Sequence, residues 1–220
     1  MLLHADKSVL RLQGYKVYTR PYELNIVGVR NKGIIPNRFD DEIHVFFKTS
    51  PLKWEYHIYK ATTDPGTFWL ENPMEPQGTA ILMQGQYADA YAIGMHRGEY
   101  EALVQVKPVT VLRDYQRTAY IDFMNGVRDT GLFGIDIHRA KAQGTTLYVD
   151  RYSAGCQVFQ DADDFYAFMQ MCYRHSFLYG NSFTYTLIDY RAMRRAVARR
   201  TLYGSLALTA GLLAWYETDF

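Results

Sequence analysis

The chain has 220 residues, which suits one domain with residues left for extensions. A hydrophobic content of 48% is enough for a real core and excludes a disordered chain. The formal net charge of +1 gives no reason to expect nucleic acid as a partner.

Most of the chain up to residue 150 shows the short alternating patterns of β-strands, separated by turn residues. The pattern predicts strands at 23–30, 42–47, 54–59, 80–83, 102–106, 109–113, 134–138 and 146–150. Ser50-Pro51 predicts the turn of a hairpin between the second and third of these strands. Many short strands with frequent turns favour a sandwich or an irregular barrel, so the predicted fold class is mainly β.

A helix is predicted after residue 160. Asp161 can cap the amide groups at the start of a helix over 161–179, and Gly180 is a natural stop. Four residues fall at helical spacing and predict one buried face: Phe165, Phe168, Met169 and Cys172. A last strand is predicted at 183–188.

The chain changes character beyond residue 190. Five arginines between 191 and 200 precede an apolar run from Leu202 to Tyr216. Three interpretations stay open: a helix packed on the domain or on a partner protein, an interfacial or tail anchor at a membrane, and disorder. The run is shorter than the ~20 residues of a comfortable span, and arginines before it favour the cytoplasmic side. We therefore predict a catalytic domain over 1–190 and a basic, apolar extension over 191–220.

The candidate chemistry lies in His138 and the later run Ser153-Ala154-Gly155-Cys156. A cysteine beside a glycine, with a histidine upstream, is a candidate thiol nucleophile with its base. The amides of Gly155 and Cys156 are candidates to hold an oxyanion. The alternative for Cys156 is a buried cysteine that packs as a small hydrophobic residue. Because the chain has only two cysteines, we expect free thiols rather than a disulfide bridge.

Other residues are assigned around this pair. Alternation in 134–138 places Asp136 on the face of His138, which makes it a candidate to orient the imidazole. Ser153 either hydrogen-bonds near the thiol or closes a turn. Four residues are predicted to contact the substrate: Arg139, His96, Ala154 and Gln157.

The order and spacing of His138 and Ser153–Cys156 resemble the catalytic domain of the L,D-transpeptidase (YkuD-type) family, whose motif ends in Ser/Thr-His-Gly-Cys. The segment 62–68 (TTDPGTF) resembles the family's Thr-Pro-Thr-Gly-x-Phe segment. The resemblance covers 43–159, and the overall sequence resembles that of uncharacterised members from phages and gut bacteria. Ala154 replaces the usual histidine of the motif, and Val158 replaces an arginine that is common in the family.

The resemblance implies an L,D-transpeptidase-like β-sandwich or irregular barrel, with one helix after the nucleophile strand and a C-terminal helical extension. It implies cysteine-dependent acyl transfer on peptidoglycan stem peptides. An amine acceptor would make the protein a transpeptidase, and water would make it a wall-cutting hydrolase of the endolysin kind. The alternative is a catalytically silent wall-binding or phage virion structural protein, which Ala154 and Val158 favour.

No cofactor is expected, because the chain lacks a zinc-binding Cys/His set and a glycine-rich phosphate loop. Asp114, Asp122 and Asp129 lack the spacing of an EF-hand. The first 13 residues carry charges and lack the apolar region of a secretory signal. An enzyme of this kind would reach the wall by phage delivery, as part of a virion, or at lysis.

Overall fold

The computed structural model describes residues 2–31, 36–191 and 193–194. The described residues divide into a compact unit over 18–189 and a second unit that contains 2–17 together with 190–191 and 193–194. The predicted division into a domain over 1–190 and an extension over 191–220 stays a prediction. The apolar run at 202–216 lies outside the described residues, so its three interpretations stay predictions.

In the second unit, helix α1 (Leu2–Leu12) is a feature that the strand-based prediction omits. Its buried positions are Ala5, Asp6, Val9 and Leu10, which recur at the three-to-four-residue spacing of one helix face. Among the described residues, no helix is both long and apolar enough to cross a membrane.

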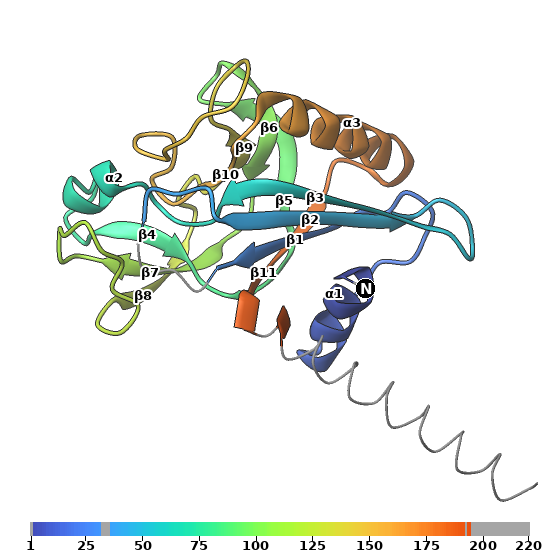
Figure 1. Cartoon of the computed structure of the whole chain (residues 1–220), viewed down its shortest axis with the longest axis horizontal. Coiled ribbons are helices and arrows are strands. Elements are labelled where there is room, and N and C mark those ends of the chain that lie inside the picture. The colour runs from blue at the N-terminus through green and yellow to red at the C-terminus, as the bar shows by residue number, and fades with distance from the viewer. Residues whose placement is uncertain (1, 32–35, 192, 195–220) are drawn as a thin grey trace, which may run out of the picture. The chain divides into compact units, whose positions relative to one another are not determined.

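The unit over 18–189 is built on a closed eight-stranded barrel (Figure 1). Its strands are β1 (Asn25–Arg30), β2 (Asp41–Lys48), β3 (Trp54–Thr62), β5 (Gly85–His96), β6 (Tyr100–Gln105), β9 (Ile137–Arg139), β10 (Gln157–Phe159) and β11 (Phe183–Asp189). Around the barrel they follow the order β1-β11-β5-β6-β9-β10-β3-β2. The pairs β1–β11 and β9–β10 are parallel. The mainly β fold class is therefore confirmed.

A smaller antiparallel sheet has the order β4-β7-β8 and lies near the short helix α2 (Figure 1). The strands of this sheet are β4 (Thr79–Leu82), β7 (Val109–Asp114) and β8 (Val127–Gly131), and helix α2 spans Thr67–Glu71. Leu70, Ile81, Leu112 and Ile121 form an apolar cluster that joins α2 to this sheet. The cluster fixes α2, and with it the end of the 62–68 segment, against β4.

Helix α3 (Ala162–Tyr179) contacts β9 and β10 and adds to the barrel core (Figure 1). The Asp161 side chain accepts hydrogen bonds from two backbone amides at the start of the helix, as predicted. The predicted apolar face is buried, and Phe168 stacks on Phe159 of β10 at 5.0 Å between ring centroids. This packing holds the strand that follows Cys156.

The predicted hairpin is confirmed, because β2 pairs with β3 along its whole length and Lys48 lies opposite Trp54. The predicted strand at 146–150 is wrong. This stretch contributes only isolated bridges, such as the one between Arg38 and Tyr148. The barrel is closed, and β10 already pairs with β9 on one side and with β3 on the other. Residues 146–150 therefore find no free strand edge of the barrel to pair with.

Candidate active site

The two motif segments meet in the structure. Thr62 ends β3 and pairs with Val158 of β10, which directly follows the cysteine motif. The Gly66 amide donates a hydrogen bond to the Ser153 carbonyl at 2.9 Å. A side chain on Gly66 would collide with the backbone of Asp150, so only glycine permits this approach. The 62–68 segment therefore supports the loop that carries Cys156.

A buried ionic cluster anchors the 62–68 segment from below. Arg30 donates to the Thr63 carbonyl at 2.7 Å, and its Nε lies 2.8 Å from Asp64 Oδ1. The Asp41 carboxylate accepts hydrogen bonds from the Thr63 amide and hydroxyl at 2.7 and 2.8 Å. Burial, followed by the neighbouring Asp64 charge, raises the pKa of Asp41 to about 7. The segment is thus held by one buried arginine and two buried carboxyl groups.

Strands β9 and β10 bring His138 and Cys156 to the same face of the barrel wall. The strands are parallel, with His138 opposite Val158, and the Gln157 amide donates to the Asp136 carbonyl at 2.9 Å. Register partners in a parallel pair point to the same face, and alternate residues share it. His138 and Val158 therefore share a face, and continuing the alternation two residues back places Asp136 and Cys156, which lie just outside the strands, on the same face. The predicted strand at 134–138 is observed only over Ile137–Arg139, so the prediction is wrong for its first three residues.

Cys156 is half-buried and has a free thiol, whereas Cys172 is free and fully buried in the helix core. The Cys156 thiol donates a hydrogen bond to the Gly134 carbonyl at 3.4 Å. Burial raises the pKa of Cys156 to about 12, and the Asp136 carboxylate adds to this effect. The resting sulfur is therefore a protonated thiol at neutral pH.

His138 is buried, and one edge of its ring is held. Its Nδ1 lies 2.8 Å from the Arg139 carbonyl oxygen and 3.2 Å from the Tyr100 hydroxyl. A carbonyl can only accept, so this network assigns the proton to Nδ1 and the lone pair to Nε2. Nε2 is buried, and no described protein group bonds to it. Burial, then the charge of His96, lowers the pKa of His138 from 6.5 to about 3. The ring is a neutral proton acceptor.

His96 stacks on His138, with 4.1 Å between ring centroids and 19° between ring planes. The His96 Nδ1 lies 2.7 Å from Asp136 Oδ2. Asp136, the predicted orienter, thus contacts His96 and not the His138 ring. Arg139 places its guanidinium 3.8 Å above the Tyr100 ring and supplies the carbonyl that holds His138. His96 and Arg139, both predicted to contact substrate, therefore pack around the imidazole.

Ser153 closes the turn before the nucleophile, which is one of its two predicted roles. Its hydroxyl donates to the Cys156 carbonyl at 2.8 Å and accepts from the Gly155 amide at 3.2 Å. The Gly155 amide is thus engaged, and only the Cys156 amide of the predicted oxyanion pair has no such bond within this turn. Gly155 has φ +124°, and a side chain there would collide with the Ala80 carbonyl.

Gln157 lies fully buried on the barrel side of β10. It donates to the Gly155 carbonyl at 3.1 Å and accepts from the Tyr185 hydroxyl at 2.8 Å. Both ends of its amide are therefore used inside the protein. The structure places Gln157 as a support for the turn rather than at a surface that a substrate reaches.

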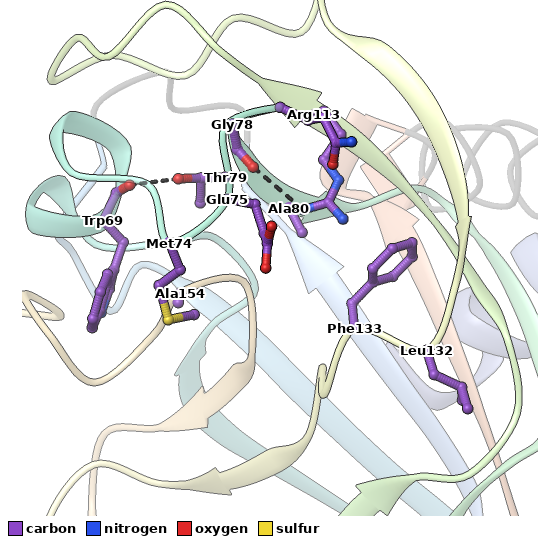
Figure 2. Close-up of a pocket in the computed structure, with 11 residues that line it drawn as sticks. Trp69, Met74, Glu75, Gly78, Thr79, Ala80, Arg113, Leu132, Phe133 and Ala154 are labelled. Atoms are coloured by element: carbon purple, nitrogen blue, oxygen red, sulfur yellow. Dashed lines mark hydrogen bonds between the residues drawn. The ribbon is translucent and has the colours of Figure 1, made fainter.

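A pocket of about 400 Å³ opens beside the cysteine turn (Figure 2). Trp69, Met74 and Ala154 are drawn on one side of it, with Leu132 and Phe133 on the other. Ala154 lies two residues before Cys156, and Phe133 directly precedes Gly134. The Gly134 carbonyl is the group that the Cys156 thiol contacts. Of the four predicted substrate residues, only Ala154 lines this pocket.

Arg113 contributes the positive charge of the pocket. Its Nε donates to Asp129 at 3.1 Å, Nη1 donates to the Gly78 carbonyl at 3.3 Å, and the guanidinium lies 4.7 Å above the Phe133 ring. Neither Arg113 nor Tyr100 has a sequence signal that predicts its place, because both reach the site through strand pairing. Among the described residues, no group of three or more His, Cys, Asp or Glu side chains is arranged to hold a metal ion.

Comparison with known proteins gives no match: no family model fits the chain, and no curated protein or solved structure matches it significantly.

Proposed function

We propose that this chain catalyses cysteine-dependent acyl transfer on peptidoglycan stem peptides, on an L,D-transpeptidase-like barrel. One observation carries the proposal: a half-buried thiol, one residue before β10, and a buried neutral imidazole on β9 lie on one face of this parallel pair, and the imidazole Nε2 has no hydrogen-bond partner among the described residues. A buried polar atom left without a hydrogen bond is costly and therefore favours a functional use. The contact between the 62–68 segment and the cysteine turn adds support.

The proposed first step forms a thioester. The Cys156 sulfur attacks the carbonyl carbon of a stem-peptide amide while His138 Nε2 takes the thiol proton. The C–N bond then breaks, and His138 returns that proton to the leaving amine. Because the pKa of the thiol is about 12 and that of the imidazole about 3, proton transfer has to accompany the attack. The Cys156 amide is the donor that remains for the oxyanion.

The second step releases the acyl group. An amine acceptor attacks the thioester carbonyl, forms a new amide and restores the thiol, which gives a transpeptidase. Water forms a carboxylic acid by the same route, which gives a hydrolase. The pocket beside Ala154 supplies room for a group bound next to the reacting carbon.

The second candidate function is a catalytically silent wall-binding or virion structural protein. The state of the Cys156 thiol favours this silent function, because the thiol donates a hydrogen bond to the Gly134 carbonyl and the pKa of Cys156 is raised. Val158 also favours it. It stands where the family commonly has an arginine and is buried in an apolar cluster with Phe39 and Val149.

The test is intact-mass spectrometry of the protein incubated with defined muropeptides. We expect a thioester adduct on the wild type and on Cys172→Ala, and none on Cys156→Ala. His138→Gln should slow adduct formation about 100-fold or more, because it removes the general base. Cys172→Ala is the matched control, since it removes the thiol that the proposal does not use.

Adding an amine acceptor separates the two reactions. Formation of a new crosslink identifies a transferase, and loss of the adduct to a free acid identifies a hydrolase. A folded wild-type protein that binds wall fragments and never acquires an adduct would overturn the enzymatic proposal in favour of the silent one.

A further inference from the structure

One tight turn brings two side chains to the His138 ring. Strands β5 and β6 form a hairpin in which His96 lies opposite Tyr100. Arg97 and Gly98 in the turn both have positive φ, at 51° and 73°. His96 then covers the face of the His138 imidazole, and the Tyr100 hydroxyl lies 3.2 Å from its Nδ1. The hairpin therefore holds the imidazole by a face and by an edge.

Asp136 fixes His96 in turn. Its Oδ2 lies 2.7 Å from His96 Nδ1, and its Oδ1 accepts the Gln105 amide at 2.9 Å. Both residues are buried, at 6% and 8% relative exposure, and neither lines the pocket beside the cysteine. His96 is thus held in place by Asp136, which lies just before β9 and is itself bonded to β6, rather than placed to contact a substrate.

The stacked ring also acts electrostatically. Charge on His96, Arg97 and Arg139 disfavours a second positive charge on His138. The Asp136 carboxylate faces His96 at 2.7 Å, and Tyr100 is uncharged at neutral pH because burial raises its pKa to about 12. A His138 imidazolium formed during the reaction would therefore be short-lived, which favours prompt proton return to the leaving amine.

We propose that His96 and Asp136 are a positioning pair that fixes both the orientation and the neutral state of His138. The inference rests on the proposed role of His138 as the general base. It assigns to His96 a role different from substrate contact.

The test measures the ring titration of His138 directly, by ¹⁵N NMR of histidine-labelled protein. His96→Phe keeps an aromatic ring in the stack and removes the charge, and His96→Gln keeps a donor for Asp136. In both variants the His138 titration midpoint should rise, by about one pH unit, because a neighbouring positive charge is removed. The control is His57→Phe, which replaces a histidine also stacked between rings but located on β3.

The second readout is the pH dependence of thioester formation at Cys156. Its acidic limb should move upward with the NMR midpoint in the His96 variants and stay in place in His57→Phe. A purely structural role would change the amount of folded protein without moving either midpoint. An unchanged His138 titration in folded His96 variants overturns the inference.

The two proposals fail separately. The NMR titration needs no turnover, so a shifted midpoint without any adduct on the wild type would remove the catalytic role and refute the proposed function. An adduct on the wild type with no shift in the variants would refute the positioning role alone.

Discussion

At the residue scale, His138 combines burial with a neutral ring, which links this side chain to acid stability. Its pKa is lowered from 6.5 to about 3 by burial and the His96 charge. Between these two values the unfolded chain binds more protons than the folded one. The stabilising contribution of the neutral ring is therefore complete above about pH 6.5 and is lost as pH falls toward 3, by at most about 1.4 kcal/mol per pH unit.

His138→Gln should remove this acid sensitivity. Urea unfolding at pH 7 and pH 4.5 is expected to show a smaller drop in the free energy of unfolding for the variant than for the wild type. The difference between the two proteins is the informative quantity, because Asp41 contributes with the opposite sign. The pKa of Asp41 is raised to about 7, so its contribution is lost as pH rises. Equal drops in both proteins would contradict the buried neutral imidazole.

Gly155 gives a second prediction at this scale. Gly155→Ala should destabilise the protein by several kcal/mol, because φ +124° disfavours a side chain and the added Cβ collides with the Ala80 carbonyl. Gly98→Ala is the matched control, since φ is +73° there and a Cβ meets nothing within 4 Å. The control should cost only about 1–2 kcal/mol. Equal losses in chemical unfolding would argue against close packing of the cysteine turn on β4.

At the element scale, the contact between the 62–68 segment and the cysteine loop can be broken at Gly66. Gly66→Ala should push the segment away from Asp150 and weaken the bond to the Ser153 carbonyl. We expect the rate of Cys156 alkylation to change while Cys172 stays unreactive, because the cysteine loop loses its support. Gly85→Ala is the control, since its Cβ meets only ordinary contacts with Tyr87. Identical alkylation rates in both variants and the wild type would contradict the coupling.

Elements with local signals could be predicted from the sequence. The helix over 161–179 has a capping aspartate, a terminal glycine and an apolar face, and α3 matches it almost to the residue. Strand β5 has no comparable signal, because it is rich in Ala and Gly. It exists because β6 and β11 pair with it on both sides. Strand β10, three residues long, is too short to show an alternating pattern.

The candidate site also has a part that the sequence predicts and a part that it does not. The spacing of His138 and Cys156 is visible in the sequence, and parallel pairing of β9 and β10 brings them to one face. The stacking of His96 on His138 depends on the register of the β5–β6 hairpin, which the sequence does not reveal. The engaged Gly155 amide likewise depends on the direction of the Ser153 hydroxyl.

At the scale of the whole molecule, the barrel is a rigid frame on which the candidate chemistry lies at one short strand pair. Strands β9 and β10 are three residues each, yet they are held between β6 and β3 and covered by α3. Tyr185 reaches across the barrel interior to Gln157, and Gly28 leaves room for its ring. Site geometry is thus fixed from inside the barrel as well as from the loops above it.

Closure of the barrel also has a consequence for protein synthesis. Strand β1 pairs with β11 in parallel, and Ile26 lies opposite Tyr185. One edge of β1 therefore stays unpaired until the ribosome has synthesised β11. At translation speeds of about 5–20 residues per second, the delay is roughly 8–30 s on the ribosome. During this interval the nascent chain exposes an unpaired strand edge that can recruit other chains. Yield of the native protein will therefore depend on how well chaperones shield that edge until the last strand emerges.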